Sequence, residues 1–595
     1  MRLLDAFLDG FSDTLTLARG YLLSDGSLRL LQYLAAHERP TTDPVLRRWA
    51  FNDVVGYAVA KGGLETLQWL LDSYMPDEFL TKAVAEAASG GHLHVLEYLW
   101  ANYRSRGYWG ATEMGRAVRN KHSAVVAWLR DHTVLRPEFA VKLVRDAVCC
   151  GDLATLQWLI EHFDVDTSRA LIVASRQDQW DMVRWMIENC ELVTHLGKPY
   201  SKYFDLAAGD GNLEFLKFAT SRKLWTPSAR DASWMISSAA AAGHLDVVKW
   251  LHEELDTNSA DDGYVNAAMG GHLEVLKYLH EKHLRNGSKQ SPMDMAAKGG
   301  FLDVVQWLHE NRREGCTSAA MHHAAVNGHM DVVKWLHSHR REGCKKTTLV
   351  RAAGVGNLEM VQWLHDNRRD VFFGPGAMDR AATWGHLDVV KWLHESRGER
   401  CSVEAMNGAA ACGFLEVVKW LHENRSEGCT KEAMDIAAAN GHLKIVQWLH
   451  ENRHEGCSVK AMNEAAVRGH LDVVKWLHEN RTEGCTKWAM HAASYDHFKV
   501  VKWLCRNRSE GCTPDAIKGA IRKGLLDIAA YLHTESLECR KLEMTFPLWL
   551  SRIEEAEWVL GHFPREFRNC YVVAKPGDWY FDDWVQRTRC WRTRW

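Results

Sequence analysis

Apolar and polar residues repeat along most of the chain with a period of about 28 residues. The segment from Gly413 reads GFLEVVKWLHENRSEGCTKEAMDIAAAN, and close copies follow from Gly441 and Gly469. An aromatic residue stands seven positions after each opening, as at Trp420 and Trp448. A repeat of this length predicts a solenoid, in which each repeat packs only on its neighbours and core size does not limit chain length.

The repeats are regular in the second half of the chain and irregular before it, where their spacings run from 27 to 36 residues. We therefore divide the chain into degenerate repeats over 1–240, regular repeats over 241–550, and a terminal degenerate repeat with a Trp/Arg-rich tail over 551–595. We place the openings at Gly26, Gly62, Gly91, Lys121, Gly151, Asp178, Gly211, Gly243, Gly271, Gly300, Gly328, Gly356, Gly385, Gly413, Gly441, Gly469, Asp496, Gly524 and near Ser551.

Each repeat is predicted to contain two helices. Val417 and Leu421 stand four residues apart in one segment, and Ala433 and Ala437 stand four apart in the other, which is helical spacing. Thr430 is a suitable N-cap for the alanine-containing segment. No segment has the alternation of a strand, so we predict an all-α helix-turn-helix solenoid whose core follows the aromatic column.

The pattern A-A-x-x-G-H-x-x-V-V-x-x-L, present at Ala324–Leu336 and in a close variant at Ala437–Leu449, resembles the ankyrin repeat. The period of 28 is shorter than that family's 33, and the Thr-Pro-Leu-His tetrapeptide is absent. The resemblance implies an ankyrin-like superhelix with truncated fingers, and HEAT-like or other paired-helix solenoids are the structural alternative.

Composition restricts the function further. The net charge of −3 and pI near 6.9 give no electrostatic footprint for nucleic acid. No apolar run is long enough to span a membrane and no targeting segment is visible, so we expect a monomeric cytoplasmic protein, with the nucleus as an alternative. The fifteen cysteines are then expected to be reduced thiols.

The motifs that carry chemistry have structural explanations. His450 to His454 matches the zinc-protease pattern H-E-x-x-H, but neighbouring repeats keep His-Glu-Asn-Arg without the second histidine. The histidine and cysteine columns form ladders, because equivalent positions in stacked repeats lie too far apart to share a metal or a disulfide. We expect no catalysis, no metal and no cofactor.

Side chains that vary between otherwise constant repeats predict where a partner binds. They cluster on the first helix, which lines the concave face in ankyrin-like stacks, and Trp384 is the strongest anchor candidate. We therefore predict a scaffold that binds a protein partner along this face. The candidate residues are His322, His323, Arg351, Asp379, Arg380, Trp384, Asn407, Asp435, Asn440, Asn463, Glu464 and Arg468.

The alternative function rests on the tail, 561–595, where tryptophans alternate with arginines. Such a segment can stack on bases or touch a membrane surface, which would make the protein a nucleic-acid or membrane-surface adaptor. It can also cap the last repeat. The residues concerned are Trp579, Trp584, Trp591, Trp595, Arg587, Arg589, Arg592 and Arg594.

Overall fold

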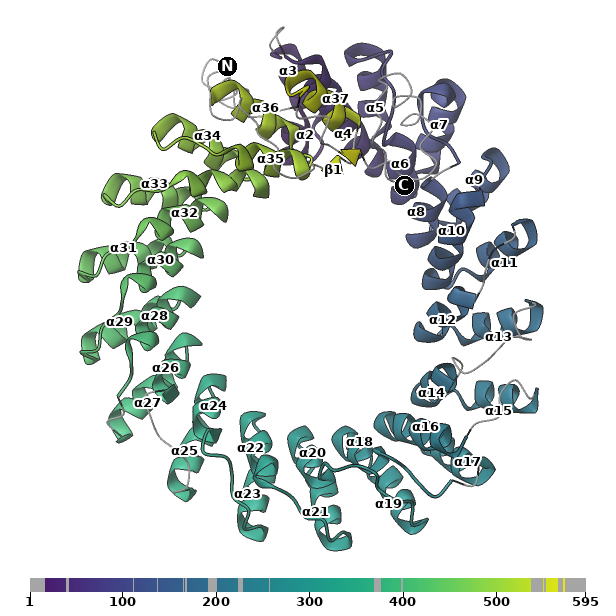
Figure 1. Cartoon of the computed structure of the whole chain (residues 1–595), viewed down its shortest axis with the longest axis vertical. Helices are drawn as coiled ribbons and strands as arrows, with labels where there is room; N and C mark the ends of the chain where they lie inside the picture. The colour runs from purple at the N-terminus through teal and green to yellow at the C-terminus, as the bar shows by residue number, and fades with distance from the viewer. Residues whose placement is uncertain are drawn as a thin grey trace. The chain divides into compact units, whose positions relative to one another are not determined.

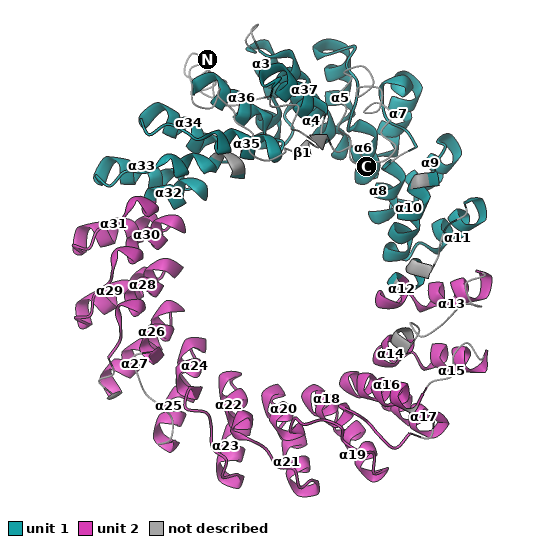
Figure 2. Cartoon of the chain, viewed as in Figure 1, with its two compact units in different colours: residues 1–173, 462–595 teal, residues 174–461 magenta. Residues whose placement is uncertain are grey.

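The computed structural model describes residues 17–38, 42–110, 112–135, 137–163, 165, 168–190, 201–222, 228–255, 257–368, 376–397, 400–536, 549–550, 553–565 and 571–572. Packing divides the chain into two compact units, shown in Figure 2: unit 1 contains residues 1–173 and 462–595, and unit 2 contains residues 174–461. The predicted domain boundaries at 240 and 550 rest on how regular the repeats are in sequence, and they stay a prediction.

The opening turns confirm the register of the repeats. Each opening that the structure describes has a positive φ, which ends the first helix of the repeat in the left-handed region. Gly356 has φ 81°, and the substitutes Lys121, Asp178 and Asp496 have φ 61°, 56° and 66°. Glycine predominates here because other L-residues meet a steric penalty in this region.

The repeat at Gly413 shows how the sequence builds its helices. Its second helix ends at Asn424, and Gly428 turns the chain with φ 75°. The hydroxyl of Thr430 then accepts a hydrogen bond of 3.3 Å from the backbone N–H of Glu432, which caps the following first helix as predicted.

The core differs from the sequence prediction. Val417, Leu421, Met434 and Ala437 are buried, whereas Trp420 of the aromatic column is only half-buried. The prediction that the core follows this column was therefore wrong for the regular repeats, apart from the buried Tyr278. The paired alanines leave room for helix backbones to approach closely, and an indole is too large for that space, so it lies beside the core.

The first helices of neighbouring repeats pack closely on one another, and the second helices contact one another less. Closer packing on one side curves a stack toward that side. Within unit 2, the first helices accordingly lie along the inner side of the curve and the second helices along the outer side (Figure 1).

Unit 2 alternates first helices, which have even numbers, with second helices, which have odd numbers. They are α13 (Trp180–Asn189), α14 (Ser201–Gly209), α15 (Leu213–Ser221), α16 (Ala229–Ala242), α17 (Leu245–Leu255), α18 (Gly263–Gly270), α19 (Leu273–Glu281), α20 (Pro292–Gly299), α21 (Leu302–Asn311), α22 (Ser318–Val326), α23 (Met330–His339), α24 (Thr348–Val355), α25 (Leu358–Asn367), α26 (Gly376–Thr383), α27 (Leu387–Arg397), α28 (Val403–Cys412), α29 (Leu415–Asn424), α30 (Lys431–Ala439) and α31 (Leu443–Asn452).

Unit 1 contains the repeats of both chain ends, and α12 and α32 cross its boundaries. Its helices are α2 (Leu17–Leu23), α3 (Leu28–Ala36), α4 (Pro44–Ala60), α5 (Leu64–Trp69), the π-helix η1 (Leu70–Tyr74), α6 (Ala83–Gly90), α7 (Leu93–Tyr103), the 3-10 helix η2 (Arg104–Arg106), α8 (Glu113–Arg119), α9 (Ser123–His132), α10 (Pro137–Cys150), α11 (Leu153–His162), α12 (Ser168–Arg176), α32 (Val459–Val467), α33 (Leu471–Asn480), the 3-10 helix η5 (Lys487–Tyr495), α34 (Phe498–Asn507), α35 (Pro514–Arg522), α36 (Leu526–Glu535) and α37 (Ile553–His562).

The all-α prediction holds for the repeats, and one short parallel pair is added to it, β1 (Trp549–Leu550) with β2 (Tyr571–Val572). Among the described residues, no helix has the length and hydrophobicity needed to cross a bilayer.

Within unit 1, repeats from opposite ends of the sequence pack together. Helix α4 contacts both α36 and α37. Asn52 Nδ2 donates to Glu554 Oε1 over 3.3 Å, and Arg48 Nη2 lies 3.1 Å from Glu557 Oε2. Asn52 is fully buried and Glu554 nearly so, so this contact is part of the unit's interior.

Candidate functional site on the first helices

Several of the predicted partner-binding residues join neighbouring repeats to one another. Asp435 on α30 accepts hydrogen bonds from the backbone N–H and the hydroxyl of Ser458, at 2.7 and 2.6 Å. Asn407 on α28 pairs with Thr430 in the same way, since its Oδ1 accepts from the N–H and its Nδ2 donates to the hydroxyl, both at 3.0 Å. We call this arrangement the cap bridge, because it holds the N-cap residue of the next first helix. Its members are Asp294–Thr317, Asp379–Ser402, Asn407–Thr430, Asp435–Ser458 and Asn463–Thr486.

His322 occupies the same column and is also buried. Its Nδ1 lies 2.8 Å from the hydroxyl of Thr348, which itself donates to the Lys345 carbonyl. Burial, helped by the charge of Lys345, lowers the pKa of His322 to about 4, so the imidazole is neutral at physiological pH. The Asp, Asn and His side chains of this column therefore serve packing between repeats.

The remaining candidates lie closer to solvent. His323, Glu464 and Asn440 are half-buried, and Asn440 Nδ2 donates to the Ala411 carbonyl over 2.7 Å. Of the twelve candidates, Asn463, Glu464 and Arg468 belong to unit 1 and the other nine to unit 2. The exposed candidates are Arg351, Arg380, Trp384 and Arg468.

Exposed apolar side chains gather on the first helices of unit 2. Trp384, directly after α26, is 55% exposed, and Val355 at the end of α24 is also 55% exposed. Trp234 on α16, Met269 on α18 and Ile436 on α30 are exposed on the same series of helices. Sequence reasoning identified only Trp384, although Val355 stands in the same column, one residue before its opening.

Histidine, tryptophan and arginine side chains of the second helices and their turns contact neighbouring repeats. The ring of His422 lies edge-on to Trp448 of the next repeat, 5.2 Å between centroids. Arg453 in the next turn places Nη1 3.5 Å from His422 Nδ1 and forms a bidentate ion pair with Glu455. The histidines of this column are thus partly exposed and contact the next repeat.

A second set of histidines and aromatic residues packs on the opening glycines. His92 Nε2 lies 2.9 Å from the Ala60 carbonyl of the preceding repeat. A Cβ added to Gly356 would lie 2.3 Å from His386 Nδ1. Glycine is therefore required there for space as well as for φ.

The cysteine column lies mostly at buried turns. Burial and the charge of Glu455 raise the pKa of the Cys429 thiol to about 11, which makes it unreactive. Cys512 departs from the expectation of reduced thiols because it is disulfide-bonded, whereas the other described cysteines form no disulfide. That expectation came from the lack of a visible targeting segment, and the separate distance argument constrains pairing only within the column.

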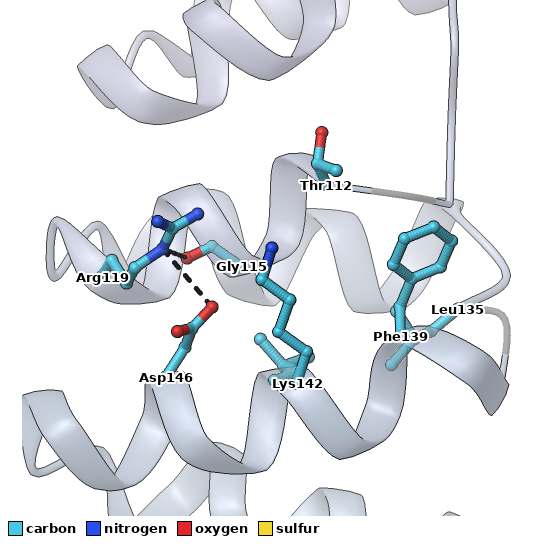
Figure 3. Close-up of a pocket in the computed structure, with 8 residues that line it drawn as sticks. Thr112, Gly115, Arg119, Leu135, Phe139, Lys142 and Asp146 are labelled. Atoms are coloured by element: carbon cyan, nitrogen blue, oxygen red, sulfur yellow. Dashed lines mark hydrogen bonds and ion pairs between the residues drawn. The ribbon is translucent and has the colours of Figure 1, made fainter. Parts of the chain in front are cut away.

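Each unit has a hollow among its described residues. In unit 1, a cavity of about 20 Å³ between α8 and α10 is closed by Arg119 and Asp146, whose Nε and Oδ2 are 3.3 Å apart (Figure 3). That volume suits a single water molecule. Burial raises the pKa of Asp146, against the opposing charge of Arg119.

In unit 2, an open hollow of about 570 Å³ is lined by Asp178, Asp210, Glu214 and Asp246. Burial and the neighbouring Asp178 raise the pKa of Asp210 to about 6. Within the described ranges, no three His, Cys, Asp or Glu side chains are grouped so that they could hold a metal ion, and this holds for His450 and its neighbours as well. The tryptophans and arginines of the tail lie outside the described residues.

Family models for ankyrin repeats match this chain. The model for three ankyrin copies matches residues 302–372, 321–405, 378–463, 406–487 and 434–518, and the model for many copies matches 264–309. Residues 264–518 therefore contain ankyrin repeats. The models stop short of the N-terminal repeats, yet those repeats show the same helix pairs and positive-φ openings. The period of 28 thus shortens the ankyrin repeat while its helix pair is retained.

Comparisons with individual proteins add little. No curated protein matches the sequence. One solved structure with some similarity is the pentatricopeptide repeat protein PPR10 from maize, at 12% identity and a TM-score of 0.27, covering 89% of this chain and 96% of that one. No functional conclusion follows from it.

Proposed function

We propose that this protein is a scaffold that binds a partner protein along the first helices of unit 2. The observation that carries the proposal is the series of exposed apolar side chains on those helices, from Trp234 to Ile436. Exposing a tryptophan or valine side chain to water is unfavourable, at about 25 cal/mol per Å² of apolar surface, so such a series favours an interaction surface.

The rest of the unit supports the same proposal. The second helices use their aromatic, histidine and arginine side chains on neighbouring repeats, which leaves the first helices as the surface with apolar groups to spare. A rigid cap-bridged frame that presents varied side chains is suited to recognition of an extended partner surface.

Site-specific photocrosslinking in cell extract tests the proposal. The photoreactive residue p-benzoylphenylalanine replaces Trp384 in one variant and Lys391, exposed on α27, in the control. We expect a defined crosslinked protein from position 384 that is absent from position 391 and is competed away by the unmodified chain. Equal crosslinking from both positions, or none from 384, would contradict the proposal.

A further inference from the structure

Helices α24 and α26 each present an exposed arginine and, four residues later, an exposed apolar side chain. Arg351 is followed four residues later by Val355, and Arg380 is followed four residues later by Trp384. Residues four apart lie one turn apart on the same side of a helix. Since α24 and α26 pack on each other, two arginines lie at one level of the face and two apolar side chains at the next.

The cations on this face form no ion pair with the described residues. Arg380 extends across α24, since a Cβ on Gly354 would meet its Cγ at 2.6 Å. No ion pair joins Arg351, Arg380, Lys298 or Lys345 to any described residue, and all four are exposed. The turn arginines of the second-helix side differ, because each is paired with a glutamate two residues later.

The pKa of His323, which lies among these cations, reflects their positive charge. Burial lowers the pKa of His323, and the charges of Lys345 and Lys298 lower it further. The carboxylate of Asp294 raises the pKa of His323, but its effect is smaller than that of either lysine. Cations that outweigh the carboxylates near them create a positive potential that attracts an anionic group.

We propose that Lys298, His323, Lys345, Arg351, Arg380 and Trp384, together the basic face, bind an acidic segment of a partner protein. Two carboxylates of the segment pair with the two arginines, and an apolar side chain beside them packs between Val355 and Trp384. This rests on the proposed function and names the chemistry of its partner.

The geometry and charge favour an acidic peptide. The guanidinium group matches a carboxylate in a bidentate arrangement, and tryptophan is a frequent interface anchor. The basic face is a local patch in a chain of net charge −3, whereas nucleic-acid binding typically needs a longer basic stripe along the backbone path. Val355 and Trp384 can also be covered only by a ligand that carries an apolar side chain.

Fluorescence anisotropy with synthetic probes tests the proposal on the full chain. The probes are a fluorescein-labelled 15-residue peptide in which Glu pairs alternate with Leu, the same peptide with Gln in place of Glu, and a labelled dT15 oligonucleotide. We expect the Glu peptide to bind at least tenfold more tightly than the Gln peptide, with an affinity that falls as salt is added. The charge reversal R351E/R380E should weaken Glu-peptide binding at least tenfold, and Trp384→Ala several-fold.

The control for each single charge reversal is Arg313→Glu, which makes the same change as R351E or R380E alone at an exposed turn outside the basic face and should leave binding unchanged. The milder R351Q/R380Q and far-ultraviolet circular dichroism separate lost binding from lost folding. Equal binding of the Glu and Gln peptides, unchanged binding by R351E/R380E, or tighter binding of dT15 than of the Glu peptide would each overturn the proposal. Crosslinking at position 384 that persists despite such a result would leave the scaffold function standing and reject only the acidic partner.

Discussion

The cap bridge makes a quantitative prediction for Asp435→Ala. The carboxylate is 7% exposed and accepts two hydrogen bonds from Ser458. Hydrogen bonds to a charged group contribute about 1.5–3 kcal/mol each. Because Ser458 is half-buried, water can replace part of this interaction. We therefore expect the substitution to destabilise the local repeat by about 2–4 kcal/mol.

The chain itself supplies the matched control. Asp435→Asn should keep both bonds, since Asn407 and Asn463 hold Thr430 and Thr486 through an amide in the same geometry. Its cost should stay below about 1 kcal/mol, as expected for a neutral in place of a charge-assisted bond.

Hydrogen exchange measured by mass spectrometry suits this prediction better than global unfolding, because a long repeat array need not unfold in one step. Peptides covering 428–442 and 456–470 should exchange at least about 30-fold faster in Asp435→Ala, the factor that corresponds to 2 kcal/mol. Peptides from distant repeats should be unaffected. If the Ala and Asn variants exchange alike, the two hydrogen bonds do not stabilise the junction and the reasoning fails.

Three further predictions concern the openings and the acidic hollow. Gly356→Ala should lower the melting temperature more than Gly328→Ala in differential scanning fluorimetry, because both have positive φ but only the first new Cβ meets the His386 ring; equal shifts would contradict this. Lys121→Gly should stabilise the chain by about 1 kcal/mol in urea unfolding by relieving a left-handed lysine, and a loss of stability would refute the account. The raised pKa of Asp210 means that its protonated form is favoured on folding, so its stabilisation is present below pH 4 and lost as pH rises through about 6. Between pH 4 and pH 7 this stabilisation should change the free energy of unfolding of the wild type by about 1 kcal/mol, after discounting for solvent screening. Asp210→Asn should remove that change, which urea midpoints of variant and wild type measured across this pH range would show.

The sequence predicts the local features of this fold well. Helical spacing and glycine openings are set by residues close together in the chain, so the helix pairs, the Thr430 cap and the register follow from the pattern. The aromatic column was misplaced because periodicity identifies a helix face without saying how deeply a large ring can enter between alanine-lined helices. Trp420 shows the result, being half-buried beside a core of Val, Leu, Met and Ala.

The candidate site was only partly predictable. Variation between repeats selected both the exposed Arg351 and Trp384 and the buried Asn407 and Asp435, since variation alone does not distinguish solvent from a polar junction. A signal for the junction is present, because Asp or Asn recurs in one column with Ser or Thr 23 residues later. The sequence could not predict whether Arg351 forms an ion pair, because that depends on which side chains the neighbouring helices place close to it.

The packing of α4 on α36 and α37 constrains how unit 1 can form during synthesis. Asn52 and Glu554 are separated by 502 positions, so the buried bond between them must wait until nearly the whole chain has left the ribosome. At roughly 5–20 residues per second, the first repeats spend about half a minute or more without their C-terminal neighbours. During this time the surface that α36 and α37 later cover is exposed and can bind another copy of the chain. We expect chaperones to protect the early repeats until the last repeats have been made.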